Sequence, residues 1–587
     1  MSMSKNIARL AVTAGLTAAL SFGGVMAPVT MAFAEGTPTV AESGNVTIKE
    51  DVYTDTTFKG IQIFKAKVTQ DKKDNVWNGS KTLSDIEWAG GESGSVKNTV
   101  IHAFDNVAAD SKPTDLPTGD SAQAWAEFIN NHGSEVVGNN VSAGSVLDMI
   151  ARALETQTWT DAKGGTAGTF EGIDAGYWLF ETKSVGKTTG ADGNEDAYTS
   201  PIFTVVGGEE VKAEPKKDVP NVTKAVKDDK DGKFVTDDSK NVFTAANKAA
   251  DSAAEQLVEY QLAGTVASNI NTYVKYSYAF TDNLPSTMVP NLDGNKPVVE
   301  VKINDSVVDP TCYSATYVPG ESTNALTVSF ENLKEAKDKT GDPITVNGSS
   351  TVYVNYEAKL VAGKINADML GKAQVNNVKL TYSNNPHTNG TGTTVDHPAY
   401  DYTYGIDVTK VGNDEDETGK LKTLEGVQFT LQEKDSNEFI KADGTTTTDK
   451  DGAILTTNNE GKINVVGLDE GTYILKEVTP APGYNNSASN GVTFTIARNA
   501  LKQDGTEVIP DINSANVTAA AGVVKADSAV ASTGKLSFTI VDKKGSGLPL
   551  TGLNGVTFTW IAGSAVLCIG VAHLIRSRKQ AEESEQE

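Results

Sequence analysis

Six polar side chains lie in phase with apolar residues along segments that the sequence predicts to be β-strands. In the segment 222–226, Lys224 alternates with Val222 and Val226, so a strand here directs the lysine into the core. The same alternation holds for the other members of the set, which are Asp282, Asn376, Lys410, Glu477 and Asp542. Because burying a lysine or a carboxyl group is costly unless the group is paired, we expect these side chains to be paired inside the protein.

Such groups could carry out an acyl transfer within the chain. An apolar environment disfavours charge, so a buried lysine tends toward the neutral amine and a buried carboxyl group tends to stay protonated. A neutral amine can attack the side-chain carbonyl carbon of an asparagine or aspartate that a protonated acid polarises. The product is an internal isopeptide bond, with ammonia released from asparagine or water released from aspartate.

The cysteines provide no alternative covalent cross-link. The chain has two, Cys312 and Cys568, and the second lies in an apolar run near the C-terminus. An exported protein normally gains stability from disulfides, but only Cys312 is present in the part that would be exported. Isopeptide bonds would supply covalent closure in their place.

Residues 1–34 are typical of a secretory signal peptide. Two basic residues, Lys5 and Arg9, precede an apolar region that begins at Leu10, and the sequence Ala-Phe-Ala ends this segment. Small residues in this spacing mark a cleavage site, so we expect the mature chain to start near Glu35 in an extracytoplasmic environment.

A proline turn, an apolar run and a basic stretch follow one another at the C-terminus. The turn is an LPxTG-type pentapeptide that consists of Leu548, Pro549, Leu550, Thr551 and Gly552. Residues 556–575 are long and apolar enough to span a bilayer, and the tail 576–587 begins with basic residues, which places the tail in the cytoplasm.

Between these signals, short segments rich in Val, Thr and Tyr predict a mainly β protein. We expect three β-sandwich domains in tandem, arranged as an elongated rod, with additional helices in the first domain at 121–131 and 145–154. The predicted parts are an N-terminal domain at 35–210, a charged linker at 211–220, a middle domain at 221–400 and a C-terminal domain at 401–544.

Several functional classes are disfavoured by the composition. The formal net charge of −25 makes nucleic acids and anionic membrane surfaces poor partners. No catalytic triad, phosphate-binding loop or zinc-ligand spacing is present, so we expect neither an enzyme nor a cofactor. The sequence from Asp414 to Glu425 approaches an EF-hand calcium loop, but Thr418 occupies the fifth ligand position and the flanks are predicted strands. An acidic hairpin loop without metal is the favoured interpretation, and calcium is the alternative.

The C-terminal signals and the linker resemble those of one family of surface proteins. LPLTG, an apolar span and a basic tail in this order resemble the cell-wall sorting signal of Gram-positive bacteria. The linker sequence AEPKKDVPNVTK at 213–224 resembles the pilin motif of sortase-assembled backbone pilins, through its Pro-Lys dipeptide ending at Lys216. Glu214 stands where that family usually has tyrosine.

This resemblance implies a covalent polymer. A sortase cysteine would attack the carbonyl group of Thr551 and release Gly552 with the rest of the tail, so that the predicted span is only a transient tether. Lys216 of one subunit would then resolve the acyl-enzyme and become joined to Thr551 of the next subunit. The adjacent Lys217 is the alternative nucleophile.

The last predicted domain resembles the CnaB type, which is an Ig-like sandwich closed by an isopeptide bond. VTK at 408–410, LEGVQFTLQ at 424–432 and GTYILKEVTPAPGY at 471–484 carry the resemblance, the last of them as the pilin E-box. It implies a bond from Lys410 to Asp542 with Glu477 as the acid. The family usually has asparagine at the acceptor position.

The middle domain resembles the corresponding pilin domain through FTDNLP at 280–285 and NNVKLTYSNNP at 376–386. This implies that Asp282 is the acid for a bond from Lys224 to Asn376, with Asn384 as the alternative acceptor because it lies on the same face of its strand. In the first domain, Lys49 is out of phase with its apolar neighbours, and we predict no bond there.

The resemblance as a whole implies the major structural subunit of a pilus anchored to a Gram-positive cell wall, where it supports adhesion. The implied partners are a pilus-specific sortase, a housekeeping sortase, other copies of the chain, minor pilins, peptidoglycan and an unidentified host ligand. A monomeric wall-anchored adhesin and a minor pilin at the tip or base are the alternatives. The only chemistry expected of the chain itself is single-turnover bond formation.

Overall fold

The computed structural model describes residues 36–545, apart from residues 92–93, 134–135, 138–139, 164–167, 187–192, 230–233, 235, 238–241, 244–247, 498–516, 527 and 533. Outside the described residues lie the predicted signal peptide at 1–34, the pentapeptide at 548–552, the apolar run at 556–575 and the tail at 576–587. Within the described part of the chain, no helix is long and apolar enough to cross a membrane.

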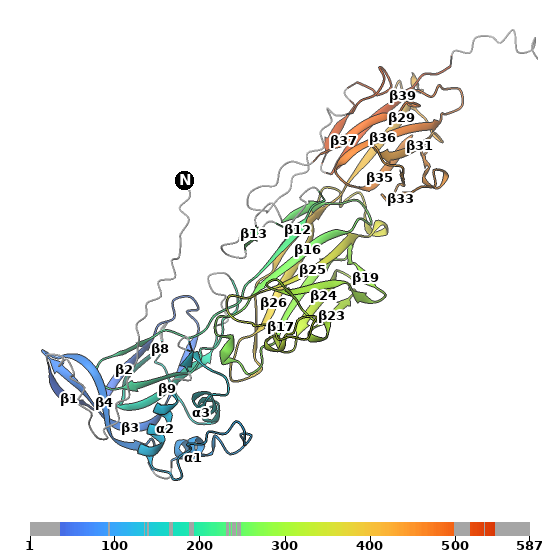
Figure 1. Ribbon diagram of the computed structural model, residues 1–587. Helices are drawn as coiled ribbons and strands as arrows, with labels where there is room; N and C mark the ends of the chain where they lie inside the picture. The colour runs from blue at the N-terminus through green and yellow to red at the C-terminus, as the bar shows by residue number, and fades with distance from the viewer. Residues whose placement is uncertain are drawn as a thin grey trace, which may run out of the picture. The chain divides into compact units, whose positions relative to one another are not determined.

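The protein is mainly β, as the sequence predicts, and most of its strands belong to mixed or antiparallel sheets (Figure 1). It divides into two compact units. The first runs to Tyr404 and includes Gly467–Asp469, and the second consists of Gly405–Val466, Glu470–Ala497 and the later described residues. Within the first unit, the sheets occupy two separate stretches of chain, 37–213 and 222–402.

The first stretch contains two larger sheets, the helices and a two-stranded sheet of β5 (Val136–Val137) and β6 (Asn140–Val141). One sheet has the order β1-β3-β9-β10, with β4 and β7 paired to β3, and the other has the order β11-β2-β8. Their bounds are β1 Thr37–Ala41, β2 Ser43–Ile48, β3 Thr57–Lys73, β4 Val76–Trp88, β7 Thr160–Asp161, β8 Gly168–Asp174, β9 Gly176–Ser184, β10 Ile202–Val206 and β11 Val211–Ala213.

Both predicted helices of this stretch are confirmed, and the structure adds a third. The helices are α1 (Ser95–His102), α2 (Ala122–Asn131) and α3 (Val146–Leu154). The side chains of Ser121 and Ser145 accept hydrogen bonds from backbone N–H groups in the first turns of α2 and α3, which explains where these helices begin. Their apolar faces pack in one core with β3, β4 and β9.

The second stretch of the first unit contains two larger sheets. Their orders are β12-β16-β25-β21-β22, with β18 paired to β25, and β15-β28-β26-β17-β24-β23, with β27 paired to β26. The bounds used below are β12 Val222–Lys227, β16 Val258–Thr265, β17 Tyr278–Pro285, β18 Met288–Pro290, β25 Thr351–Leu360, β26 Gln374–Ser383 and β28 His397–Tyr402. The remaining strands are β15 Ala249–Asp251, β21 Val299–Ile303, β22 Ser306–Val307, β23 Ser314–Val318, β24 Thr323–Phe330 and β27 Thr391–Thr393.

The strand β25 shows the alternation that its sequence predicts. Every second residue from Val352 to Leu360 is buried, and the residues between them are partly exposed. One face of this sheet therefore packs inward while the other is in contact with solvent.

The second unit is built from two sheets with orders β30-β29-β39-β38 and β33-β32-β31-β36-β37, to which β35 and β34 are added through β29 and β31. The bounds of the strands are β29 Tyr404–Glu415, β30 Leu421–Thr423, β31 Gln428–Glu433, β32 Phe439–Ile440, β33 Thr446–Thr447, β34 Leu455–Thr456, β35 Lys462–Leu468, β36 Gly471–Thr479, β37 Val492–Ile496, β38 Val530–Ser532 and β39 Lys535–Asp542. The strands β29 and β39 pair in parallel, with Lys410 opposite Ile540 and Gly412 opposite Asp542. The first and last described strands of this unit are therefore direct neighbours.

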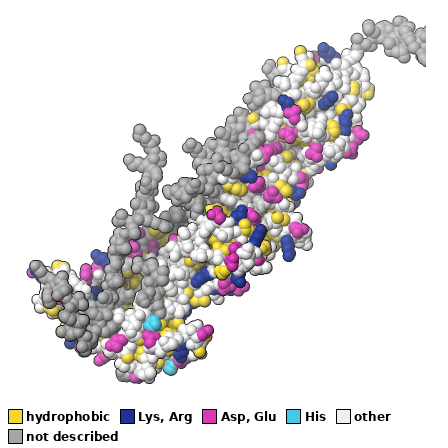
Figure 2. All heavy atoms as spheres, viewed as in Figure 1, with side chains coloured by type: hydrophobic (Ala, Val, Ile, Leu, Met, Phe, Trp, Pro, Cys, Tyr) yellow, Lys and Arg dark blue, Asp and Glu magenta, His cyan; other side chains and the backbone are white. Residues whose placement is uncertain are grey.

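Acidic and basic side chains are interspersed on the face of the molecule shown in Figure 2. On the coloured part of that face, the basic side chains do not form a continuous surface.

Candidate functional site

The first site is a polar cluster inside the larger sandwich of the first unit. It consists of Lys224 on β12, Asp282 on β17, Tyr356 on β25 and Asn376 on β26, and is called the Lys224 cluster below. Lys224, Asp282 and Asn376 are fully buried, which confirms the burial expected from the alternation. The strands β12 and β25 belong to one sheet and β17 and β26 to the other, so the cluster bridges the two sheets.

Hydrogen bonds connect all four side chains of the Lys224 cluster. The amine Nζ of Lys224 donates to Oδ1 of Asp282 and, over 3.1 Å, to the hydroxyl of Tyr356. The Tyr356 hydroxyl donates to Oδ2 of Asp282 and accepts from Nδ2 of Asn376 over 2.8 Å. The carbonyl oxygen Oδ1 of Asn376 has no hydrogen-bond partner among the described residues.

The environment of the Lys224 cluster favours neutral groups. Burial lowers the pKa of Lys224 to about 8, against the opposing effect of the Asp282 carboxylate. Burial raises the pKa of Asp282, although the Lys224 ammonium acts in the other direction. Because both shifts reduce the free-energy difference between the ion pair and the neutral pair, a proton can pass from the amine to the carboxyl group.

Of the two candidate acceptors, the structure places only Asn376 in the Lys224 cluster. Asn384 is also buried, but its Nδ2 donates to the backbone carbonyl of Asp196 over 3.1 Å. The alternation in sequence could not separate the two residues because both lie on one face. The pairing of β26 with β17 places Val378 opposite Asp282, and Asn376 is the next residue on the same face.

The second site lies in the second unit and consists of Lys410 on β29, Glu477 on β36 and Asp542 on β39; it is called the Lys410 cluster. All three side chains are buried, again as expected. The amine Nζ of Lys410 lies 2.6 Å from Oδ1 of Asp542 and 3.0 Å from Oε2 of Glu477. The acceptor and the lysine come from adjacent parallel strands, and the acid comes from the facing sheet.

The two carboxyl groups of the Lys410 cluster have different surroundings. Ser487 holds Oδ1 of Asp542 through its hydroxyl over 2.5 Å and its backbone N–H over 3.1 Å. Burial raises the pKa of Glu477 to about 7, which the Asp542 carboxylate also favours and the Lys410 ammonium opposes. Glu477 is therefore suited to carry a proton near neutral pH, while Asp542 is held in place beside the amine.

No comparable cluster surrounds Lys49 in the described part of the first unit. Its side chain is 64% exposed and lies 2.5 Å from the Asp51 carboxylate. The structure instead buries Glu181 on β9, whose sequence context Tyr-x-Leu-x-Glu repeats that of Glu477.

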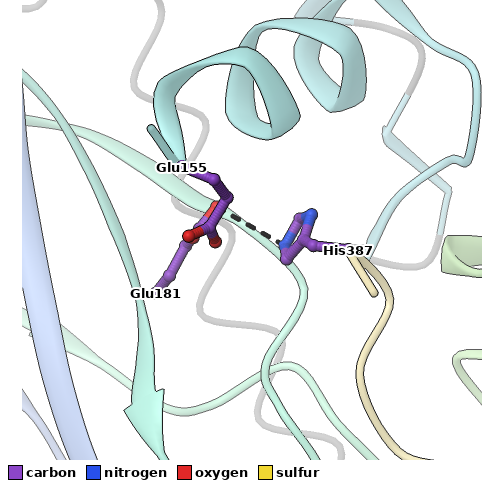
Figure 3. Close-up of side chains that lie close together, drawn as sticks. All are labelled: Glu155, Glu181 and His387. Atoms are coloured by element: carbon purple, nitrogen blue, oxygen red, sulfur yellow. Dashed lines mark ion pairs between the residues drawn. The ribbon is translucent and has the colours of Figure 1, made fainter. Parts of the chain in front are cut away.

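Glu181 belongs to a group of side chains that the sequence does not predict (Figure 3). His387, from the loop after β26, has its Nε2 3.4 Å from Oε1 of Glu181, and Glu155 at the end of α3 lies nearby. Two carboxyl groups and an imidazole could bind a metal ion. However, the Lys59 ammonium lies 2.5 Å from Glu155 and 3.6 Å from Glu181, so a cation of the protein already balances the charge.

The buried imidazole of His387 predicts an acid-sensitive first unit. Burial lowers its pKa from 6.5 to about 4, and the nearby Arg152 acts in the same direction, against Glu155. Between pH 6.5 and pH 4, His387 binds a proton in the unfolded chain but not in the folded chain, so the free energy of unfolding falls as the pH falls. Relative to His387→Gln, the wild type should lose up to about 3 kcal/mol between pH 6.5 and 4. Thermal unfolding across this range measures the difference, and parallel curves for the two proteins would contradict it.

The linker lysines differ in their surroundings. The Lys217 amine lies 2.6 Å from the Glu50 carboxylate and 2.5 Å from the Asp196 carboxylate, and only 8% of its side chain is exposed. Lys216 is held by its backbone, which receives a hydrogen bond from Ser200 N–H and donates one to the Thr199 hydroxyl. The Lys216 amine forms no ion pair or hydrogen bond with the described residues.

The acidic loop near Asp414 is a turn between β29 and β30, which the sequence predicts, and its carboxylates have partners within the protein. Asp416 accepts hydrogen bonds from Thr418 and Lys420, and Asp414 accepts one from the Tyr484 hydroxyl and pairs with Lys544. Strands, not helices, flank this loop, in contrast to an EF-hand.

Comparison with known proteins gives matches of two kinds. The family model SpaA, described as a prealbumin-like fold domain, matches residues 406–509. No curated protein matches the chain.

Three solved pilin structures resemble this chain over most of its length. The T6 backbone pilin of serotype M6 Streptococcus pyogenes is 15% identical, with 86% of this chain and 100% of that chain covered and a TM-score of 0.48. The major pilin SpaD of Corynebacterium diphtheriae is 16% identical over 86% of this chain and 98% of its own, with a TM-score of 0.41. The major pilin SpaA of the same species is 11% identical over 85% and 100%, also with a TM-score of 0.41. The family match gives this chain a likeness to the SpaA prealbumin-like fold domain at residues 406–509.

Proposed function

We propose that the chain is the structural major subunit of a covalently polymerised pilus, and that its two units are closed by isopeptide bonds that the protein forms by itself. The observation that carries this proposal is the presence of two buried clusters that contain the same three kinds of group. Each contains a lysine, a carboxyl group that can hold a proton, and an asparagine or aspartate acceptor.

In the Lys224 cluster, the ammonium gives a proton to Asp282, and the neutral amine attacks Cγ of Asn376. The C–N bond to Nζ forms, the bond from Cγ to Nδ2 breaks, and ammonia leaves. In the Lys410 cluster, the amine attacks Cγ of Asp542 in its protonated form, Glu477 relays the proton, and water leaves. Burial supports these reactions because it disfavours the charged forms of Lys224, Asp282 and Glu477.

The position of these bonds suits a fibre under tension. A bond between Lys410 and Asp542 would join β29 to the parallel β39, so that force entering at one end of the unit would pass to the other end through a covalent link. A bond between Lys224 and Asn376 would join the two facing sheets of the larger sandwich in the first unit.

Assembly of the fibre would use the linker and the C-terminal pentapeptide. A pilus-specific sortase would cleave between Thr551 and Gly552 and transfer the acyl group to Lys216, and a housekeeping sortase would attach the base of the pilus to peptidoglycan. The structure favours Lys216 over Lys217 because two carboxylates hold the Lys217 amine as a buried ion pair. A nucleophilic lysine must present a free, neutral amine to the acyl-enzyme.

Replacement of Lys216 tests whether the chain is polymerised through this lysine. In wall extracts of cells that make the pilus sortase, Lys216→Ala should abolish the high-molecular-weight ladder and leave a wall-attached monomer, because the neighbouring Lys217 amine is held in buried ion pairs. Lys212→Ala, an exposed lysine in β11, is the matched control and should retain the ladder. A ladder that persists in Lys216→Ala would show that another amine is the nucleophile, and a wild type without a ladder would favour the monomeric wall-anchored adhesin.

A further inference from the structure

Tyr356 occupies the centre of the Lys224 cluster, where it contacts every group that takes part in the proposed bond formation. Its hydroxyl accepts from the nucleophile Nζ over 3.1 Å, accepts from the leaving atom Nδ2 of Asn376 over 2.8 Å, and donates to Oδ2 of Asp282. The side chain is buried between the sheets and its ring stacks on Tyr260, with ring centroids 5.3 Å apart. The sequence shows Tyr356 only as one residue on the apolar face of its strand.

We propose that Tyr356 is a catalytic residue that relays protons from Asp282 to the departing nitrogen of Asn376. This inference rests on the isopeptide bond proposed above and adds a residue to its mechanism. The need for a relay follows from the chemistry, because ammonia can leave only after Nδ2 has gained a proton. Asp282 contacts Lys224 and Tyr356, and the Tyr356 hydroxyl is the group that connects Asp282 to Nδ2, which also lies 3.9 Å from Sδ of Met288.

The two carboxyl oxygens of Asp282 exchange protons with different groups, Oδ2 with Tyr356 and Oδ1 with Nζ of Lys224. The Lys224 ammonium first passes a proton to the Tyr356 hydroxyl, which gives its own proton to Oδ2, so that the amine and the acid are both neutral. The amine then adds to Cγ of Asn376 and becomes positively charged, while Oδ1 of the amide becomes an oxyanion. The second proton of Nζ passes to Oδ1 of Asp282, which the first step has left free, as the proton on Oδ2 leaves through Tyr356, so that Asp282 never carries two protons.

The addition also reverses the polarity of the contact between Asn376 and Tyr356. In the planar amide, Nδ2 can only donate a hydrogen bond. After the addition, Nδ2 is an amine with a free electron pair, so it can accept the proton of the Tyr356 hydroxyl. The hydroxyl in turn takes the proton from Oδ2 of Asp282. The Cγ–Nδ2 bond breaks, the oxyanion becomes the carbonyl of the new amide, and ammonia leaves. Asp282 carries one proton before the addition and again one proton after ammonia has left.

Burial of Tyr356 requires the two transfers to be coupled. Desolvation raises the pKa of this phenol well above its ordinary value, and the Asp282 carboxylate acts in the same direction. A free phenolate is therefore disfavoured, and the phenol must receive one proton while it gives another. The direct contacts with Asp282 and Asn376 allow this exchange.

The Lys410 cluster provides a contrast within the same chain. Glu477 and Asp542 both contact the Lys410 amine directly, and the hydroxyl that holds Asp542 is that of Ser487. No tyrosine is needed for the proposed reaction there. The rate at which the Lys410–Asp542 bond forms is therefore an internal reference for any change made at Tyr356.

The test measures both bonds in the full exported chain. Protein is produced by cell-free synthesis, sampled over time and digested, and the Lys224–Asn376 and Lys410–Asp542 cross-linked peptides are quantified by mass spectrometry. Tyr356→Phe should slow the first bond on the order of 100-fold and leave the second unchanged. The control Tyr278→Phe removes another buried phenol of this sandwich, which donates to the Thr265 carbonyl, and should form both bonds at the wild-type rate.

A second substitution separates proton transfer from packing. Fluorinated tyrosine at position 356 keeps the shape of the side chain but makes the phenol more acidic, so it should change the rate of the first bond. An unchanged rate would overturn the relay, as would a folded Tyr356→Phe protein that forms the bond at the wild-type rate or a Tyr278→Phe protein that is equally slow. If the wild type itself lacks the Lys224–Asn376 bond, the proposed function fails at this site and the relay fails with it.

Discussion

Replacing Asp282 with asparagine is expected to leave the Lys224–Asn376 bond unformed, so that the protein keeps one ammonia that the wild type loses. Asparagine has nearly the same shape as aspartate but cannot hold the protons that must pass from Nζ of Lys224 to the departing nitrogen, so the addition cannot be completed. The variant also loses the carboxylate that pairs with the fully buried Lys224. Both effects destabilise the first unit.

The expected loss of stability from Asp282→Asn is large. The cross-link from Lys224 to Asn376 closes a loop of about 150 residues, which contributes roughly 5 kcal/mol through the entropy of the unfolded chain. For a domain of this size, that corresponds to a decrease of about 10–20 °C in the Tm of the first unit. Intact mass and calorimetry measure the two effects together. The exposed Asp305→Asn is the control, and an Asp282→Asn protein with the bond intact would contradict the role of Asp282.

Replacing Glu477 with glutamine is expected to leave the Lys410–Asp542 bond unformed and to keep one water in the protein. Glutamine preserves the shape of the side chain, but it removes the buried acid whose pKa of about 7 lets it exchange protons with Lys410 near neutral pH. The second unit should again lose roughly 5 kcal/mol of stability through loop entropy, while the bond in the first unit forms normally. Peptide mapping by mass spectrometry distinguishes the two bonds.

Two further substitutions sharpen this second prediction. Asp542→Asn supplies an amide acceptor at the same place, so the bond should still form, but with loss of ammonia in place of water. Glu460→Gln changes an exposed acid of the same unit and should have no effect. A cross-linked Glu477→Gln protein would contradict the role of Glu477 as the acid. An Asp542→Asn protein with neither loss would show that the Lys410 cluster is only a buried ion pair.

The sequence predicts which polar groups are buried because burial follows the two-residue period of a strand. Lys224, Asp282, Lys410, Glu477 and Asp542 all share a face with apolar neighbours, and the structure buries all of them. The mainly β class and the helices α2 and α3 follow from the same kind of periodicity.

The two-residue period within a strand does not predict the contacts between strands. Asn376 and Asn384 have the same phase, and only the pairing of β26 with β17 shows which one lies beside Asp282. Tyr356 looks like an ordinary core residue until its hydroxyl is placed between two sheets. Periodicity within one strand contains no information on the register between strands or on the packing of facing sheets.

The residues contributed by loops are even less accessible from sequence. His387 reaches Glu181 from a loop that follows β26, and Lys217 is paired with Glu50 and Asp196. The pilin motif alone could not choose between Lys216 and Lys217 as the nucleophile. The buried ion pairs of Lys217 supply a physical reason for the choice, since a lysine held by two carboxylates is a poor nucleophile.

The intact mass of the purified exported chain, from Glu35 to the last described residues, tests the central claim most directly. The account predicts a mass lower than that of the sequence by one ammonia and one water, with the losses located at Lys224–Asn376 and Lys410–Asp542. A mass equal to that of the unmodified sequence would contradict the account.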